Sequence, residues 1–135
     1  MNVSRSGARR VIKLDSQGAF HSKYLKDISK EFKEFLKNYN FENKKSKTSN
    51  IYYNYTGNKE DNTNDNIHTL LEKQIYSRVK FMQIIENMLD DGINTFYEIG
   101  NGGNLAFHIN SIAKAKNKEI KVYKISKYED YIGVI

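Results

Sequence analysis

The 135-residue sequence contains no cysteine, no proline and no tryptophan. Without cysteine, the chain has neither a disulfide framework nor thiolate chemistry. It also lacks any run near the about 20 apolar residues that a membrane-spanning helix needs, and residues 1–7 lack the apolar core of a signal peptide. Hydrophobic residues make up 39% of the chain and aromatic residues 13%. These values predict one compact core that is adequate rather than large.

The charge balance is basic, with a formal net charge of +6, which favours acidic partners. Apart from Arg9–Arg10 and residues 44–47, the basic side chains are scattered among glutamate and asparagine, as is typical of a solvated surface in a lysine-biased proteome. The alternative is a small basic binding module. Because the sequence shows neither a basic helix face nor an RNP-like strand with paired aromatics, we expect no nucleic-acid partner, and no membrane partner either.

Hydrophobic periodicity predicts that short strands alternate with helices. The predicted strands cover residues 11–14, 51–55, 95–99 and 121–125, and the predicted helices cover residues 24–39, 67–75, 79–89 and 105–113. Residues 40–50 and 58–66 are polar and are predicted to be loops, whereas residues 128–135 form an apolar tail. This alternation predicts an α/β fold built in layers.

The first predicted helix, residues 24–39, carries apolar residues at three- and four-residue steps, which predicts that this face packs against the core. The members of this face are Tyr24, Leu25, Ile28, Phe32, Phe35, Leu36 and Tyr39. Ser22 is the predicted N-cap of this helix, and Asp65 or Asn66 is the predicted cap of the next helix. Helix 79–89 is apolar on most sides, which predicts deep burial.

One histidine stands at the entrance to the first helix, in Gly18-Ala19-Phe20-His21-Ser22. Small residues before an imidazole let the backbone approach a neighbouring group closely, but a histidine beside a helix start is by itself typical of an ordinary surface position. His68 and His108 have no ligand-type residue at metal spacing, so we expect no metal site. The glycines of residues 100–103 suit a strand-to-helix turn better than a phosphate loop, because the third glycine of a dinucleotide fingerprint is absent.

Four segments in this order resemble those of the malonyl-CoA:acyl carrier protein transacylases. They are residues 7–14 with the histidine loop 18–22, then Tyr53-Asn54-Tyr55-Thr56-Gly57, then Leu70-Leu71-Glu72-Lys73-Gln74-Ile75, and finally Thr95-Phe96-Tyr97-Glu98-Ile99-Gly100-Asn101-Gly102. The resemblance runs from about Gly7 to about Ile112. Asn101 stands where the family has proline, which preserves the turn chemistry but puts its rigidity in doubt.

The resemblance implies that the chain is the C-terminal portion of such an enzyme. Residues 16–135 would form the C-terminal part of an α/β-hydrolase-like acyltransferase core, and residues 1–15 would be the last strand of a ferredoxin-like small subdomain. The implied reaction moves malonyl from CoA to acyl carrier protein in type II fatty acid synthesis by a Ser-His mechanism. The implied partners are acyl carrier protein, malonyl-CoA and the missing N-terminal half, and no cofactor is implied.

The resemblance also implies roles for three residues. His21 would be the general base, and Gln74 would orient it through its backbone carbonyl, which makes an aspartate unnecessary. Phe20 would contact the substrate and favour malonyl over methylmalonyl, because its ring fills the space of an α-methyl group. The alternative for Phe20 is plain core packing.

The nucleophile itself is missing, because no serine stands in a Gly-x-Ser-x-Gly elbow. The arginine that would pair with the malonate carboxylate lies upstream in the family. We therefore expect the chain to be inactive when alone, and an inactive fragment is the second interpretation of this polypeptide.

Overall fold

The computed structural model describes residues 18–41, 49–61, 63–100 and 103–133. The elements are a 3-10 helix η2 (Lys23–Leu25), α1 (Lys26–Leu36), α2 (Asn64–Tyr76), α3 (Phe81–Asp90), β1 (Thr95–Ile99), α4 (Leu105–Ala115), β2 (Lys121–Ile125) and α5 (Tyr128–Ile132). The predicted strand 11–14, the predicted subdomain 1–15 and the basic clusters at 9–10 and 44–47 lie outside the described residues. No helix in the described ranges is long and apolar enough to cross a membrane.

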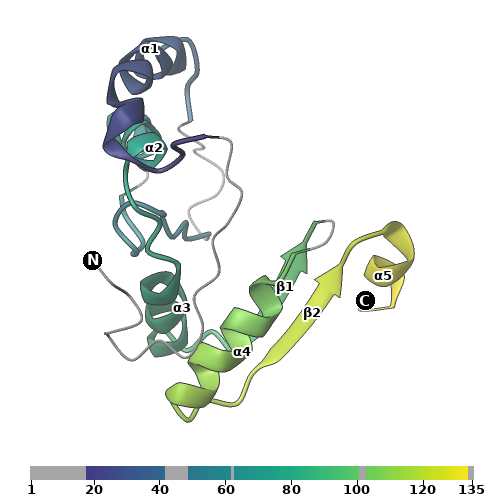
Figure 1. Ribbon diagram of the computed structural model, residues 1–135. Helices are drawn as coiled ribbons and strands as arrows, with labels where there is room; N and C mark the ends of the chain where they lie inside the picture. The colour runs from purple at the N-terminus through teal and green to yellow at the C-terminus, as the bar shows by residue number, and fades with distance from the viewer. Residues whose placement is uncertain (1–17, 42–48, 62, 101–102, 134–135) are drawn as a thin grey trace.

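The C-terminal part is a strand–helix–strand unit, as the alternation predicted. β1 and β2 run parallel, in register from Thr95 opposite Lys121 to Ile99 opposite Ile125. α4 connects them and lies along the sheet in Figure 1. The main core gathers side chains from α3, β1 and α4, namely Ile84, Ile85, Leu89, Phe96, Ile109 and Ala113. The mixed α/β architecture is confirmed.

The helices α1 and α2 pack together away from the sheet (Figure 1). A smaller core cluster of Tyr53, Ile67 and Leu70 lies beneath this pair. Both helices begin and end close to their predicted positions. This second cluster joins α2 to residues 53–55 and is separate from the core of the strand–helix–strand unit.

The predicted core face of α1 is buried only in part: Leu36 is buried, Leu25 and Phe32 are half-buried, and the other members are exposed. Tyr24 is 77% exposed, Ile28 59% and Phe35 54%, and the buried residues of the helix are Ser29 and Leu36. Ser29 and Leu36 share a stripe with Lys33, whose ammonium forms an ion pair with Glu72 of α2. The helix therefore turns a small and partly charged stripe toward α2.

Residues 51–55 do not form the predicted strand. Tyr52 makes an isolated bridge with Lys59, and the chain turns at once, with the Gly57 N–H donating to the Tyr53 carbonyl. Gly57 has φ +75°, a conformation in which glycine is unstrained. The aromatic residues that suggested a strand instead pack on neighbouring helices, because Tyr53 joins the core beside α2 and Tyr52 packs against the main core.

Three finer predictions also need correction. Ser22 precedes η2, but its hydroxyl donates to the Ala19 carbonyl (2.6 Å) and does not accept from the helix. α2 begins at Asn64 after Thr63, so neither Asp65 nor Asn66 is its cap. α3 is buried on one side alone, because Met82 is 61% exposed.

Candidate active site

His21 is anchored at two points to the last turn of α2. Its Nδ1 lies 2.8 Å from the carbonyl oxygen of Gln74, and its backbone N–H donates to the carbonyl of Ile75 at 3.2 Å. Carbonyls in the last turn of a helix lack partners inside the helix, so they are free to accept these bonds. His21 has φ +56°, a left-handed conformation that histidine adopts more readily than most residues. The contact that the resemblance implied between His21 and Gln74 is thus present.

The Gln74 contact determines which ring nitrogen of His21 carries the proton. A carbonyl oxygen can accept a hydrogen bond but cannot donate one, so Nδ1 must be the protonated nitrogen. The lone pair of a neutral imidazole is then on Nε2, for which the described residues offer no hydrogen-bond partner. The side chain is exposed. The negative end of the α2 dipole also favours a positive charge at this place, which is the charge a base acquires.

Phe20 lies beside His21 in the chain with its ring 73% exposed. Core packing, the alternative for this residue, is not seen among the described residues. The ring covers Gly18, where an added Cβ would come within 2.6 Å of the Phe20 Cε2 atom. Glycine at position 18 therefore provides space for the ring rather than an unusual backbone angle.

Glu98 is a buried carboxylate that our sequence reasoning missed. Its side chain is 6% exposed and accepts hydrogen bonds from the backbone N–H groups of Leu105 (3.0 Å) and Ala106 (2.9 Å) at the start of α4. The bond from Ala106 does most to lower the pKa of Glu98 below 4.5, burial opposes it, and the Leu105 bond and Lys124 add to the lowering. The sequence did offer a signal for this contact. Glu98 is the second-last residue of a strand that is followed by glycines and a helix, and a carboxylate is stabilised near a helix N-terminus.

The Glu98 carboxylate also occupies the place where a phosphate would bind at the start of α4. Anions bind at helix N-termini because the first backbone N–H groups lack partners. At α4, Glu98 already occupies two of these groups, and a Cβ on Gly103 would overlap its Oε1 atom. Glycine at position 103 therefore leaves room for the carboxylate of the protein itself.

The other two histidines have different surroundings. His68 is buried, and its Nε2 donates to the Tyr39 carbonyl at 3.0 Å. His108 is exposed on α4, with its ring against Phe107. Among the described residues, no group of three or more histidine, aspartate or glutamate side chains is placed to hold a metal ion.

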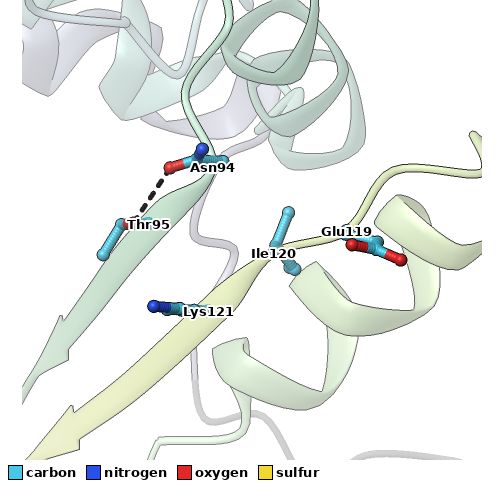
Figure 2. Close-up of a pocket in the computed structure, with 5 residues that line it drawn as sticks. All are labelled: Asn94, Thr95, Glu119, Ile120 and Lys121. Carbon is cyan, nitrogen blue, oxygen red and sulfur yellow. Dashed lines mark hydrogen bonds between the residues drawn. The ribbon is translucent and has the colours of Figure 1, made fainter.

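A shallow depression of about 350 Å³ lies at the start of both strands (Figure 2). It is lined by Asn94, Thr95, Glu119, Ile120 and Lys121, with the Thr95 hydroxyl donating to the Asn94 side chain. In parallel sheets, ligands bind beyond the carboxyl ends of the strands, whereas this depression is at the amino ends. It also lacks a nucleophile with an adjacent base. The anchored His21 is therefore the stronger candidate site.

Comparison with known proteins shows what this chain is similar to. The chain is 32% identical over 127 residues to the malonyl CoA-acyl carrier protein transacylase of Staphylococcus aureus, which covers 94% of this chain and 39% of that protein. No family model matches. The chain is thus similar, over most of its length, to about two fifths of this transacylase.

The fold agrees with solved transacylases. The transacylase from Streptococcus pneumoniae superposes with a TM-score of 0.82 and 24% identity, over 98% of this chain and 40% of that one. A malonyl-transacylase in complex with its type II PKS acyl-carrier protein superposes with a TM-score of 0.81 and 19% identity, over 96% of this chain and 39% of that one. The chain thus spans about two fifths of the length of these transacylases.

Three of the four transacylase-like segments meet at the 70–75 segment of α2. The histidine loop touches the 70–75 segment through the His21–Gln74 contact. The 53–57 segment packs on the same segment through Tyr53 beside Leu70 and through Lys73, whose ammonium lies 5.0 Å from the Tyr55 ring centroid. It is also tied to α3, where the Lys80 N–H donates to the Asn54 carbonyl and the Asn87 side chain donates to the Gly57 carbonyl. The described part of the last segment forms β1 and the bend at Gly100.

Proposed function

We propose that this chain is the C-terminal portion of a malonyl-CoA:acyl carrier protein transacylase and contributes its general base, His21. The observation that carries the proposal is the contact between His21 Nδ1 and the Gln74 carbonyl, which leaves the Nε2 lone pair available. In this role Gln74 is a positioning residue, because it acts through the imidazole. The similarity to the S. aureus transacylase supports the reaction class.

The proposed chemistry is two successive acyl transfers. A serine hydroxyl attacks the malonyl thioester while His21 Nε2 takes its proton. The same nitrogen then protonates the departing CoA thiolate, leaving malonyl as an ester on the serine. The phosphopantetheine thiol of acyl carrier protein reverses these steps, and its proton returns the serine to its free state. The reaction needs no metal or organic cofactor.

The serine must come from a part of the transacylase that this sequence does not contain, since no Gly-x-Ser-x-Gly elbow is present. In this proposal residues 16–135 are the C-terminal part of the α/β-hydrolase-like core, and residues 1–15 belong to the ferredoxin-like small subdomain. The missing N-terminal half would complete the site. An isolated chain would be the inactive fragment of our second interpretation.

Acyl carrier protein is the proposed protein partner. The solved complex of a malonyl-transacylase with its acyl-carrier protein supports this choice, and the net charge of +6 suits an acidic partner. Phe20 is the proposed substrate contact. Its exposed ring beside His21 is available to exclude an α-methyl group, which is worth about 10- to 200-fold in selectivity.

The first experiment is to measure the intact mass and N-terminal sequence of the native polypeptide. A mass well above 15.8 kDa, with a Gly-x-Ser-x-Gly peptide in the digest, would support a complete transacylase. A mass of 15.8 kDa without such a peptide would favour the inactive fragment.

The second experiment compares His21→Ala with His108→Ala in the native polypeptide by malonyl transfer from malonyl-CoA to phosphopantetheinyl acyl carrier protein. Loss of a general base costs about 10²- to 10⁴-fold in rate, so His21→Ala should lose at least 10²-fold. His108 is an exposed histidine on α4 and is the matched control. Full activity of the His21 variant would disprove the proposed role.

A further inference from the structure

We propose that the ion pair between Lys33 of α1 and Glu72 of α2 positions the catalytic base. The ammonium and carboxylate are 3.0 Å apart and join the two helices directly. The inference rests on the proposed function of His21, and it concerns two residues that lie outside the histidine loop.

The ion pair joins α1 to α2 at an interface where few α1 residues are buried. The aromatic face of α1 points to solvent, and the buried residues of α1 are Ser29 and Leu36. Lys33 lies between these two on the same stripe, four residues after Ser29 and three before Leu36. The α1 side of the interface therefore combines the buried Ser29 and Leu36 with a partly exposed charged contact at Lys33.

The ion pair is also linked to both anchors of His21. Glu72 is two residues before Gln74, whose carbonyl holds the imidazole, and three before Ile75, whose carbonyl holds the backbone N–H. Lys33 is on α1, which follows His21 through the short η2 helix. His21 is therefore connected to α1 through the chain and to α2 through its hydrogen bonds, and the ion pair connects α1 to α2. A shift of α2 against α1 must then move the carbonyls that hold His21.

The far end of the helix pair has tethers of its own. His68 donates to the Tyr39 carbonyl at 3.0 Å, and the Phe41 N–H donates to the Asn64 side chain at 2.9 Å. Both contacts hold the N-terminal half of α2. The Lys33–Glu72 pair is a helix-to-helix tether on the half that carries Gln74, so its removal should affect that half first.

The degree of burial separates this pair from the other ion pairs of α1. The side chains of Lys33 and Glu72 are 38% and 14% exposed, whereas those of Lys37 and Glu34 are 60% and 67% exposed. Partly buried charges are screened less by solvent and salt than exposed ones. The Lys37–Glu34 pair also lies within α1 and cannot determine how α1 meets α2. It is therefore the matched control.

The first readout is structural and uses the full chain without any assay of activity. A histidine Nδ1–H that donates to a carbonyl is protected from exchange with solvent, so its proton resonance is sharp and shifted downfield. Glu72→Gln should broaden this His21 resonance and speed its exchange by about two- to fivefold, the range that loss of an ion pair of this class allows. Glu34→Gln should leave it unchanged. The charge swap Lys33→Glu with Glu72→Lys should restore it.

The second readout is malonyl transfer by the native polypeptide. A base displaced by about 1 Å can cost up to 10²-fold in rate. Because His21 acts in the chemical step, Glu72→Gln should lower kcat by about tenfold with KM little changed, and the charge swap should recover most of the loss. Helix content from circular dichroism identifies a variant that fails to fold, in which case the charge swap decides.

The outcomes are distinct. An unchanged His21 resonance in folded Glu72→Gln would overturn the inference, as would equal effects of Glu72→Gln and Glu34→Gln, or a loss of kcat that the charge swap does not repair. Absence of malonyl transfer by the wild-type native polypeptide would instead overturn the proposed function. The resonance would still show whether the ion pair positions the imidazole.

Discussion

The helix pair α1–α2 and the unit β1–α4–β2 differ in how well the apolar periodicity of the sequence marks the buried residues. In the strand–helix–strand unit, the buried residues Ala106, Ile109 and Ala113 follow the apolar periodicity of α4, whereas β1 buries Phe96 and Glu98 and exposes Tyr97 and Ile99. In α1 the apolar periodicity marks a face that is buried only in part. The difference teaches that periodicity identifies a helix more securely than it identifies the partner of that helix.

The key polar contact of each region has a very different span. Glu98 reaches the N–H groups of α4 seven and eight residues further along the chain. His21 reaches Gln74 across 53 residues. The first contact follows from a single strand–turn–helix geometry. The second requires that α1 and α2 be packed against each other, so it depends on everything that sets this packing.

The largest expected effect comes from breaking the core of the strand–helix–strand unit. Leu89 is 3% exposed in that core. Leu89→Ala should lower the free energy of unfolding by about 2–5 kcal/mol, through lost burial and a residual cavity. Urea unfolding measures this change. Met82→Ala, at a 61% exposed position of the same helix, should cost far less, and similar costs for the two would show that α3 has a different buried face.

An intermediate effect is expected at the interface of α1 with α2. Ser29 is fully buried there, so Ser29→Leu should overpack the interface and cost about 1–3 kcal/mol of unfolding free energy. Phe35→Ser on the aromatic face, which is 54% exposed, should change stability by no more than about 0.5 kcal/mol in the isolated chain. Thermal and urea unfolding of both variants would reveal which face of α1 is the interface. A larger loss in Phe35→Ser would reverse our assignment.

A further effect is expected for Glu98→Gln. Each oxygen of the Glu98 carboxylate accepts a different backbone N–H, so the amide NH2 of glutamine would face one of these donors, at a cost of about 1–3 kcal/mol of unfolding free energy at neutral pH. The pH dependence of the unfolding free energy should distinguish this variant from wild type in acid. The folded pKa of Glu98 is below its ordinary value of 4.5, so its contribution to stability is complete above pH 4.5 and is lost as the pH falls through the folded pKa. Glu98→Gln should therefore show a shallower acid-side decline in unfolding free energy than wild type. Glu31→Gln, at an exposed position, is the control, and identical slopes for wild type and Glu98→Gln would contradict the prediction.

Several features of the candidate site were accessible from the sequence. The order of segments around Gly18–Ser22 and Leu70–Ile75 pointed to His21 and to Gln74, and the structure has them in contact. Glu98 was overlooked because a glutamate inside an apolar strand resembles an ordinary alternation of polar and apolar residues. Its role as the acceptor for the first N–H groups of α4 is seen only in the tertiary structure. The predicted strand at 51–55 was wrong because aromatic content alone does not distinguish a strand from a turn whose rings pack on helices.

The sequence by itself determined the types and approximate bounds of the helices and of the two strands in the strand–helix–strand unit, because these depend on interactions between residues a few positions apart. It also determined that the chain holds a candidate base without a Gly-x-Ser-x-Gly nucleophile. Only the tertiary structure decided which face of α1 meets α2, and that Lys33 pairs with Glu72 across that interface. The physical reason is that such packing depends on shape and charge complementarity between segments distant in the chain, which local periodicity does not encode.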